Sequence, residues 1–80
     1  MTESMSVHLE LDAKDLRCPL PLLKAKQALN SLAAGEVLRV WATDPGSLRD
    51  FRVWCEQSGH HLLSCSETQQ VYCYLIQKRA

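Results

Sequence analysis

The sequence predicts an α+β fold: a two-layer α/β sandwich of order β-α-β-α-β-β, with both helices on one face of a four-stranded mixed sheet. Two stretches space their apolar residues at the helical period, and four shorter ones alternate apolar and polar residues or are rich in β-branched and aromatic residues. With 80 residues and no repeat or linker, the chain fits one domain. We expect a disordered tail at residues 1–6 and a single domain at residues 7–80.

The first half of the chain is predicted to form a strand, a helix and a second strand. Residues 7–12 alternate apolar and polar side chains, which is typical of a half-buried strand. A helix follows from Pro19 to about Ala33, and Gly35 is expected to end it. Residues 36–42 are rich in β-branched and aromatic residues, which indicates the second strand. The core-facing residues of the helix recur at helical spacing: Leu22, Ala25, Leu29 and Leu32.

The second half is predicted to form another helix and then a hairpin. Asp44 and Pro45 open the helix as its N-cap and its first residue, and Gly59 ends it. The apolar face of this helix contains Leu48, Phe51, Trp54 and Cys55. The hairpin consists of a strand at 61–66, a polar turn at 67–70 and a strand at 71–77.

Composition and charge exclude several classes of function. Lys and Arg number 9 and Asp and Glu number 9, so the formal net charge is zero and there is no electrostatic footprint for non-specific nucleic-acid binding. The polar start of the chain lacks the basic and apolar segments of a signal peptide, and no apolar stretch is long enough to span a membrane. We therefore expect a cytoplasmic protein with no direct nucleic-acid or membrane partner, whose 4 cysteines are reduced thiols.

One cysteine stands where the first helix is predicted to begin. Cys18 is expected at the N-cap, with Pro19 at the first helical position, where a missing N–H would have had no partner anyway. A helix N-terminus carries roughly +0.5 of an elementary charge, which stabilises a thiolate and lowers the pKa of a cysteine. Because Pro21 removes another donor, the Leu20 N–H is expected to face the sulfur. This position predicts an activated thiol.

The neighbours of this thiol favour chemistry over packing. No acidic residue lies between Arg17 and Ser31, and Lys26 adds a further positive charge. The alternative is that Cys18 is a small buried hydrophobe, the commonest state of a free cysteine, but its place between an arginine and a proline favours the surface. Pro21 occupies the fourth position of what would otherwise be a Cys-x-x-Cys dithiol motif. Without a resolving cysteine there, Cys18 suits holding and delivering sulfur better than shuttling electrons.

The remaining titratable groups have structural interpretations. Cys55 is expected in the core, because free cysteine is among the most buried residue types. Helix capping is sufficient to explain Asp44. Asp44 begins one helix as Cys18 begins the other, and the two helix starts can lie near each other. Asp50 is expected to be solvated. Whether Cys65 and Cys73 are neighbours depends on the register of the hairpin. No metal is expected, because the spacing of a structural zinc site is lacking among Cys55, His60, His61, Cys65 and Cys73.

The stretch Cys18-Pro19-Leu20-Pro21, followed by a helix that contains Lys26, resembles the motif of the TusA/SirA-like sulfur-carrier family. The resemblance covers roughly residues 8–79 and continues through further matching positions: Gly35-Glu36-Val37-Leu38, Thr43-Asp44-Pro45-Gly46, Asp50 and Gly59-His60. It implies the same β-α-β-α-β-β sandwich that the residue pattern predicts.

The resemblance also implies a function. In such a protein Cys18 would accept persulfide sulfur from a cysteine desulfurase or another sulfurtransferase and relay it to a downstream acceptor protein. Known relays of this kind end in transfer-RNA thiolation, molybdenum-cofactor enzymes or sulfur oxidation. The chain is thus expected to be a sulfurtransferase-type persulfide carrier, stoichiometric rather than rapidly turning over, and no cofactor is expected. The residues expected to support Cys18 are Arg17, Pro19, Pro21, Lys26 and Asp44.

Two other classes of function remain open at this point. One is a noncatalytic interaction or regulatory protein, in which Cys18 reports the redox state. The other is a nucleic-acid-binding module, since small sandwiches of this kind occur in RNA-binding proteins. The neutral net charge and the lack of a basic and aromatic stripe count against this second class.

Overall fold

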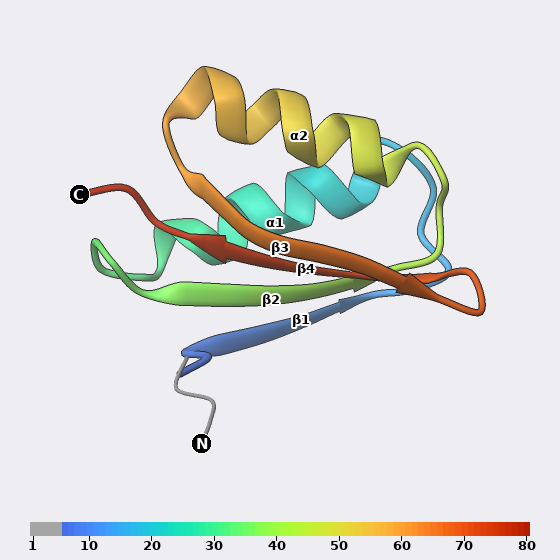
Figure 1. The fold of residues 1–80 in the computed structure, drawn as a ribbon, viewed down its shortest axis with the longest axis horizontal. Helices are drawn as coiled ribbons and strands as arrows, with labels where there is room; N and C mark the ends of the chain where they lie inside the picture. Colours follow the sequence, from blue (N-terminus) through green and yellow to red (C-terminus); the bar gives the residue numbers. More distant parts are fainter. Residues whose placement is uncertain (1–5) are drawn as a thin grey trace.

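All six predicted elements form in the computed structural model, which describes residues 6–80. The predicted disordered tail lies outside the described residues apart from Ser6, so it stays a prediction. In chain order the elements are β1 (Leu9–Ala13), α1 (Leu20–Asn30), β2 (Val37–Ala42), α2 (Ser47–Ser58), β3 (His61–Thr68) and β4 (Val71–Gln77) (Figure 1).

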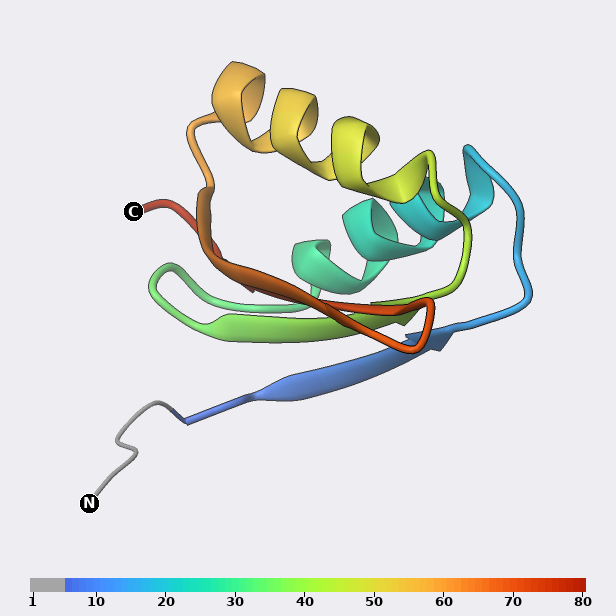
Figure 2. The ribbon, with the colours of Figure 1, turned by 45° about the vertical axis from the view of Figure 1, so that its right-hand side comes forward.

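The four strands form one mixed sheet in the order β1-β2-β4-β3. β1 and β2 are parallel, whereas β4 is antiparallel to both of its neighbours, β2 and β3. Both helices lie on the same face of this sheet (Figure 2). The predicted fold class, an α+β two-layer sandwich with two helices over a four-stranded mixed sheet, is therefore confirmed.

The core lies between the helices and the sheet, and strand register decides which side chains enter it. Leu38 of β2 is paired with Leu9 of β1 on one side and with Ile76 of β4 on the other, so the three side chains share the face beneath the helices. The same alternation leaves Glu10 and Arg39 on the other face, where they form an ion pair at 3.4 Å. The buried cluster comprises Ala13, Ala25, Leu29, Leu38, Val40, Ala42, Phe51, Cys55, Tyr74 and Ile76.

The end of α1 differs from the prediction. The helix ends at Asn30, and the N–H groups of Ser31 and Leu32 donate to the carbonyls three residues earlier, at 3.1 and 3.0 Å, in a tightened last turn. Gly35 was expected to end the helix, but this expectation is wrong. It lies in the next turn with a φ of 85°, and its N–H donates to the Lys78 carbonyl at 2.8 Å.

The second helix and the hairpin follow the prediction more closely. Gly59 ends α2 with a φ of 85°, and its N–H donates to the Cys55 carbonyl at 3.0 Å. β4 has its predicted bounds, but β3 extends to Thr68. The hairpin turn is therefore reduced to Gln69 and Gln70, whose φ values of 51° and 68° suit the twist of a two-residue turn.

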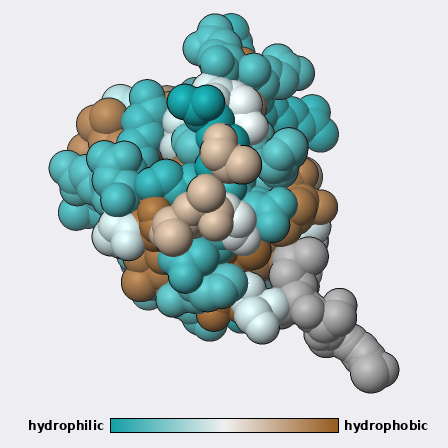
Figure 3. All heavy atoms as spheres, turned by 90° about the vertical axis from the view of Figure 1, so that its left-hand side faces the viewer, coloured by the Kyte–Doolittle hydropathy of each residue, from teal (hydrophilic) through white to brown (hydrophobic). Residues whose placement is uncertain are grey.

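The topology brings both helix starts to one end of the molecule. Because β1 and β2 are parallel and Ala13 is paired with Ala42, the two strands end side by side, and the loops that follow them start at the same end of the sheet (Figure 1). At the opposite end, where both helices finish and the C-terminus lies, hydrophilic residues cover most of the surface (Figure 3). Neither helix within residues 6–80 is long and apolar enough to cross a membrane.

Candidate functional site

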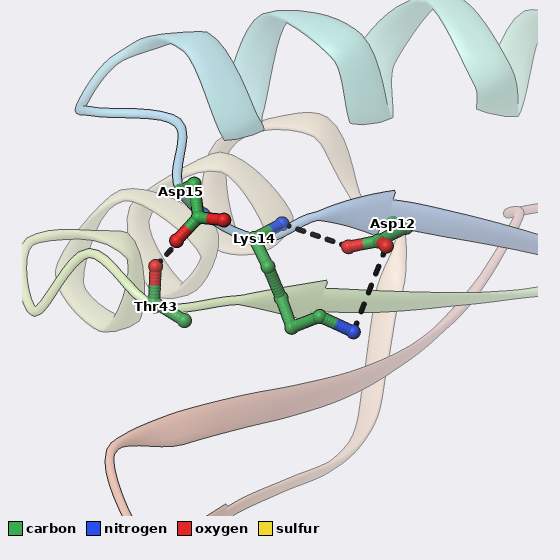
Figure 4. Close-up of polar contacts among 4 residues, drawn as sticks. All are labelled: Asp12, Lys14, Asp15 and Thr43. Atoms are coloured by element: carbon green, nitrogen blue, oxygen red, sulfur yellow. Dashed lines mark hydrogen bonds and ion pairs between the residues drawn. The ribbon is translucent and has the colours of Figure 1, made fainter.

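The loops that lead into α1 and α2 are held together by a hydrogen bond between them. The backbone N–H of Asp15 donates to Oγ1 of Thr43 at 2.9 Å (Figure 4). Asp12 closes the start of the first loop: its Oδ1 accepts from the Lys14 N–H at 3.0 Å, and its Oδ2 forms an ion pair with Nζ of Lys14 at 3.6 Å. These contacts fix the path of the chain as it approaches Cys18.

Cys18 lies in the turn before α1, because the helix begins one residue later than predicted. The Leu20 N–H donates to the Arg17 carbonyl at 2.7 Å, and the helix starts at Leu20 with Pro19 as its N-cap. The predictions that Cys18 is the N-cap and that the Leu20 N–H faces the sulfur are therefore wrong. The reason is local: the turn closes through the Arg17 carbonyl and uses the donor that was assigned to the thiol.

The Cys18 thiol is exposed and points at a carboxylate of the second helix. Its Sγ donates a hydrogen bond to Oδ2 of Asp50 at 2.7 Å, across 32 residues of sequence. Asp50 lies in the first turn of α2 and is half-buried, so it is solvated only in part, and its carboxylate also accepts the hydrogen bond from Cys18. The residue pattern missed the role of Asp50 beside the thiol.

This contact changes the ionisation of the thiol. A carboxylate that accepts a hydrogen bond from a thiol favours the protonated form. The hydrogen bond to Asp50 raises the pKa of the Cys18 thiol above its ordinary value, and lost hydration and the negative charges of Asp50 and Asp44 act in the same direction. The predicted lowering of the Cys18 pKa by the helix N-terminus is therefore wrong for this structure.

Asp44 holds the second loop rather than the second helix. Its Oδ2 accepts a hydrogen bond from the Gly46 N–H at 2.9 Å, and Gly46 is the N-cap of α2, so the predicted N-cap role of Asp44 is wrong. A side chain at Gly46 would place its Cβ 2.9 Å from Oδ2 of Asp44 and 3.6 Å from Cβ of Cys18. The close approach is thus to the Asp44 carboxylate of the same loop, whereas Cys18 lies at an ordinary van der Waals distance from this position.

The other predicted supporting residues are distributed around this point. Arg17 and Pro19 are exposed beside Cys18, whereas Pro21 is buried as the second residue of α1. Lys26 lies further along α1, in a groove of about 310 Å³ between the two helices that also reaches Asp50. The remaining residues that line this groove are Leu22, Arg49, Val53, Trp54 and Gln57.

The other three cysteines lie away from the turn that carries Cys18, and all are free. Cys55 is in the core, as predicted, and burial raises its pKa to about 11. Cys65 is paired with Tyr74 and Cys73 with Ser66, so their side chains point to opposite faces of the sheet and are not neighbours. Within residues 6–80 no three His, Cys, Asp or Glu side chains converge in a way that could hold a metal.

The arrangement can support one kind of chemistry well. An exposed thiol with a carboxylate beside it and no second thiol in its loop can form a bond to an incoming sulfur atom. A disulfide between Cys18 and a neighbour within the loop is not available, because the turn contains no other cysteine. The product of such a reaction would be a persulfide on Cys18, held at the surface.

Comparison with known proteins places these residues in a family. The family model described as sulfurtransferase TusA matches residues 9–78. A sulfur carrier protein TusA of Allochromatium vinosum is 48% identical over 69 residues, covering 86% of this chain and 91% of the relative. A sulfur carrier protein TusA of Pseudomonas putida is 43% identical over 70 residues, covering 88% of each chain. The crystal structure of a SirA-like protein from Desulfitobacterium hafniense superposes with a TM-score of 0.79 at 27% identity, covering 90% of this chain and 99% of that one.

Proposed function

Because this chain belongs to the TusA sulfurtransferase family, we propose that it carries sulfur as a persulfide on Cys18 and relays it between two other proteins. The observation that supports this assignment is the position of Cys18: its thiol is exposed at the start of α1 and has no resolving cysteine in its loop. A thiol so placed can be reached by a large partner and can hold an added sulfur without discharging it at once.

The loading step is an exchange between two sulfur centres. Sγ of Cys18, after losing its proton, attacks the outer sulfur of a persulfide on the donor protein. The new S–S bond forms on Cys18 as the donor's S–S bond breaks, and the donor cysteine leaves with the electron pair and takes up a proton. Cys18 then carries the persulfide, which is a reversible modification, until an acceptor takes the outer sulfur in the same way. The chain is thus a stoichiometric carrier.

The donor is a cysteine desulfurase or another sulfurtransferase, and the acceptor is a protein of transfer-RNA thiolation, molybdenum-cofactor enzyme maturation or sulfur oxidation. Pro19 and Pro21 restrict the turn and keep the sulfur at the surface. Arg17 and Lys26 supply positive charge for docking an acidic face of either partner, and Asp44 holds the loop against which Cys18 packs.

Sulfur loading tests this proposal directly. The pure chain is incubated with a cysteine desulfurase and cysteine, and its intact mass and non-reduced peptides are then measured. We expect one added sulfur atom on the peptide that contains Cys18, and none in Cys18→Ser. Cys65→Ser is the matched control, because it removes the other exposed thiol and is expected to load like the parent.

The fold of the variants is part of the test. Because Cys18 is exposed, Cys18→Ser is expected to melt close to the parent, so that lost loading reports chemistry rather than unfolding. Loading of Cys18→Ser at the parent level would overturn the assignment of Cys18. Absence of loading from both a desulfurase and a rhodanese-type donor would overturn the carrier function.

A further inference from the structure

The Cys18 thiol has an unusual partner for an exposed nucleophile. Its Sγ donates to Oδ2 of Asp50 at 2.7 Å, and among residues 6–80 this thiol is the one hydrogen-bond partner of the Asp50 carboxylate. Within the same part of the chain Asp50 forms no ion pair, although Lys26 and Arg49 line the groove beside it. The negative charge of Asp50 is therefore left to act on the thiol.

A favourable interaction with the helix dipole explains only part of the geometry of Asp50. An acidic residue in the first turn of a helix interacts favourably with the helix dipole, and Asp50 occupies such a position in α2. That interaction does not require the side chain to meet a thiol from another helix. The contact exists because the two helix starts lie side by side: a Cβ placed at Gly46 of the second loop would be 3.6 Å from Cβ of Cys18.

The charges around Cys18 come from four segments of the chain. Arg17 precedes the thiol in its own turn, Lys26 lies on α1, Asp44 lies in the second loop, and α2 contributes Asp50 together with Arg49. Of these groups, Asp50 alone is in hydrogen-bond contact with the sulfur. The hydrogen bond to Asp50 is also the first cause of the raised Cys18 pKa, with the charge of Asp44 acting more weakly in the same direction.

We infer that Asp50 is a positioning residue that keeps unloaded Cys18 as a hydrogen-bonded thiol, so that the exposed sulfur reacts more slowly with small electrophiles and oxidants while no sulfur-donor protein is bound. The inference deepens the proposed function and rests on it for the identity of the donor. When Cys18 reacts, its proton finishes on the leaving sulfur of the donor, so no oxidant or reductant is consumed. A carrier of this design presents its sulfur openly to partners while limiting side reactions, since only a thiolate is a good nucleophile.

The test follows the reactivity of Cys18 alone, without any sulfur donor. The full chain is treated with iodoacetamide across the pH range in which thiols titrate, and alkylation of the Cys18 peptide is followed by mass spectrometry. Asp50→Asn keeps the size of the side chain and an acceptor oxygen but removes the charge. Glu56→Gln is the matched control, because it removes one negative charge from an exposed position of the same helix.

We expect the midpoint of the Asp50→Asn profile to move to lower pH, with alkylation at neutral pH several-fold faster than in the parent and a similar rate on the alkaline plateau. Glu56→Gln is expected to follow the parent. An unchanged or higher midpoint in Asp50→Asn would overturn the inference. So would a profile that rises by the same factor at every pH, because that would mean that Asp50 limits access to the sulfur rather than its ionisation.

A second variant guards against loss of structure. Should Asp50→Asn not fold by circular dichroism, Asp50→Ser is measured in its place, since serine is accepted in the first turn of a helix and is also neutral. It is expected to shift the midpoint in the same direction, and an unshifted midpoint would overturn the inference equally. Because this assay contains no donor, its failure concerns Asp50 alone, whereas failure of sulfur loading concerns the proposed function.

Discussion

A buried hydrogen bond joins the start of α2 to the sheet, and its removal should measurably destabilise the protein. The hydroxyls of Ser47 and Tyr74 are 2.7 Å apart, and the two residues are 2% and 0% exposed. Tyr74→Phe keeps the ring, which packs against Phe51 with centroids 4.5 Å apart, and removes only the phenolic oxygen. The Ser47 hydroxyl would then be buried without its partner.

The size of the effect follows from that geometry. Leaving one buried polar group unsatisfied costs about 1–3 kcal/mol, because the group has lost water and gained nothing in return. In a domain of this length each kcal/mol lowers Tm by roughly 4–8 °C. A cost of about 2 kcal/mol therefore predicts that Tyr74→Phe melts roughly 8–16 °C below the parent.

Thermal and urea denaturation followed by circular dichroism measure this cost, and a double-mutant cycle isolates the hydrogen bond. In Ser47→Ala with Tyr74→Phe both polar groups are gone, so the double variant should be less destabilised than the sum of the two single variants. The reasoning would be refuted by a Tyr74→Phe variant as stable as the parent. It would also be refuted if the two single costs simply added.

Two further predictions concern stability. Gly35 and Gly59 both have a φ of 85°, so alanine at either position should lower the free energy of unfolding by about 1 kcal/mol. Urea denaturation should show a larger loss for Gly59→Ala, because its Cβ would lie 3.2 Å from Cδ of Arg79, whereas nothing lies within 4 Å of a Cβ at Gly35. Equal costs would contradict this. Burial raises the pKa of Cys55 from 9.0 to about 11 and that of Tyr74 from 10.0 to about 12, so the folded state holds protons that the unfolded chain releases. The free energy of unfolding that these two groups contribute is complete below pH 9.0 and is lost as pH rises toward about 12. Urea denaturation at a series of pH values should show a shallower loss of stability in Cys55→Ala than in the parent. An identical dependence on pH would argue against this role of Cys55.

The order of the elements could be predicted because its signals are local. Alternation along a strand and helical spacing of apolar residues each depend on a few neighbours in sequence. Val71–Gln77 was assigned its observed bounds on this basis, and Gly59 was assigned its observed role at the end of α2. These predictions did not require knowledge of how the elements pack.

Helix ends were harder, because several local hydrogen bonds compete there. Cys18 and Pro19 fit the N-cap and first position by residue type, yet the Arg17 carbonyl captures the Leu20 N–H and moves the start by one residue. In the same way Asp44 is a good N-cap by composition, but its carboxylate binds the Gly46 N–H and closes a turn before the helix begins. A shift of one residue leaves the fold unchanged, but it removes the Leu20 N–H as a hydrogen-bond donor to the Cys18 thiol.

The ionisation of Cys18 could not be predicted locally, because the deciding group is 32 residues away. From local sequence, the sulfur is expected to feel the partial positive charge of its own helix, which is roughly half an elementary charge spread over several N–H groups. A full carboxylate charge in direct hydrogen-bond contact acts more strongly than that diffuse field, since Coulomb energy grows with charge and falls with distance. The sequence indicates that the two helices can start near each other, and the parallel pairing of β1 and β2 brings their starts to one end of the sheet. Which acid of α2 meets the thiol depends on how the two helices pack. The chemistry of this site is therefore a property of the contact between two helices rather than of the motif that marks it.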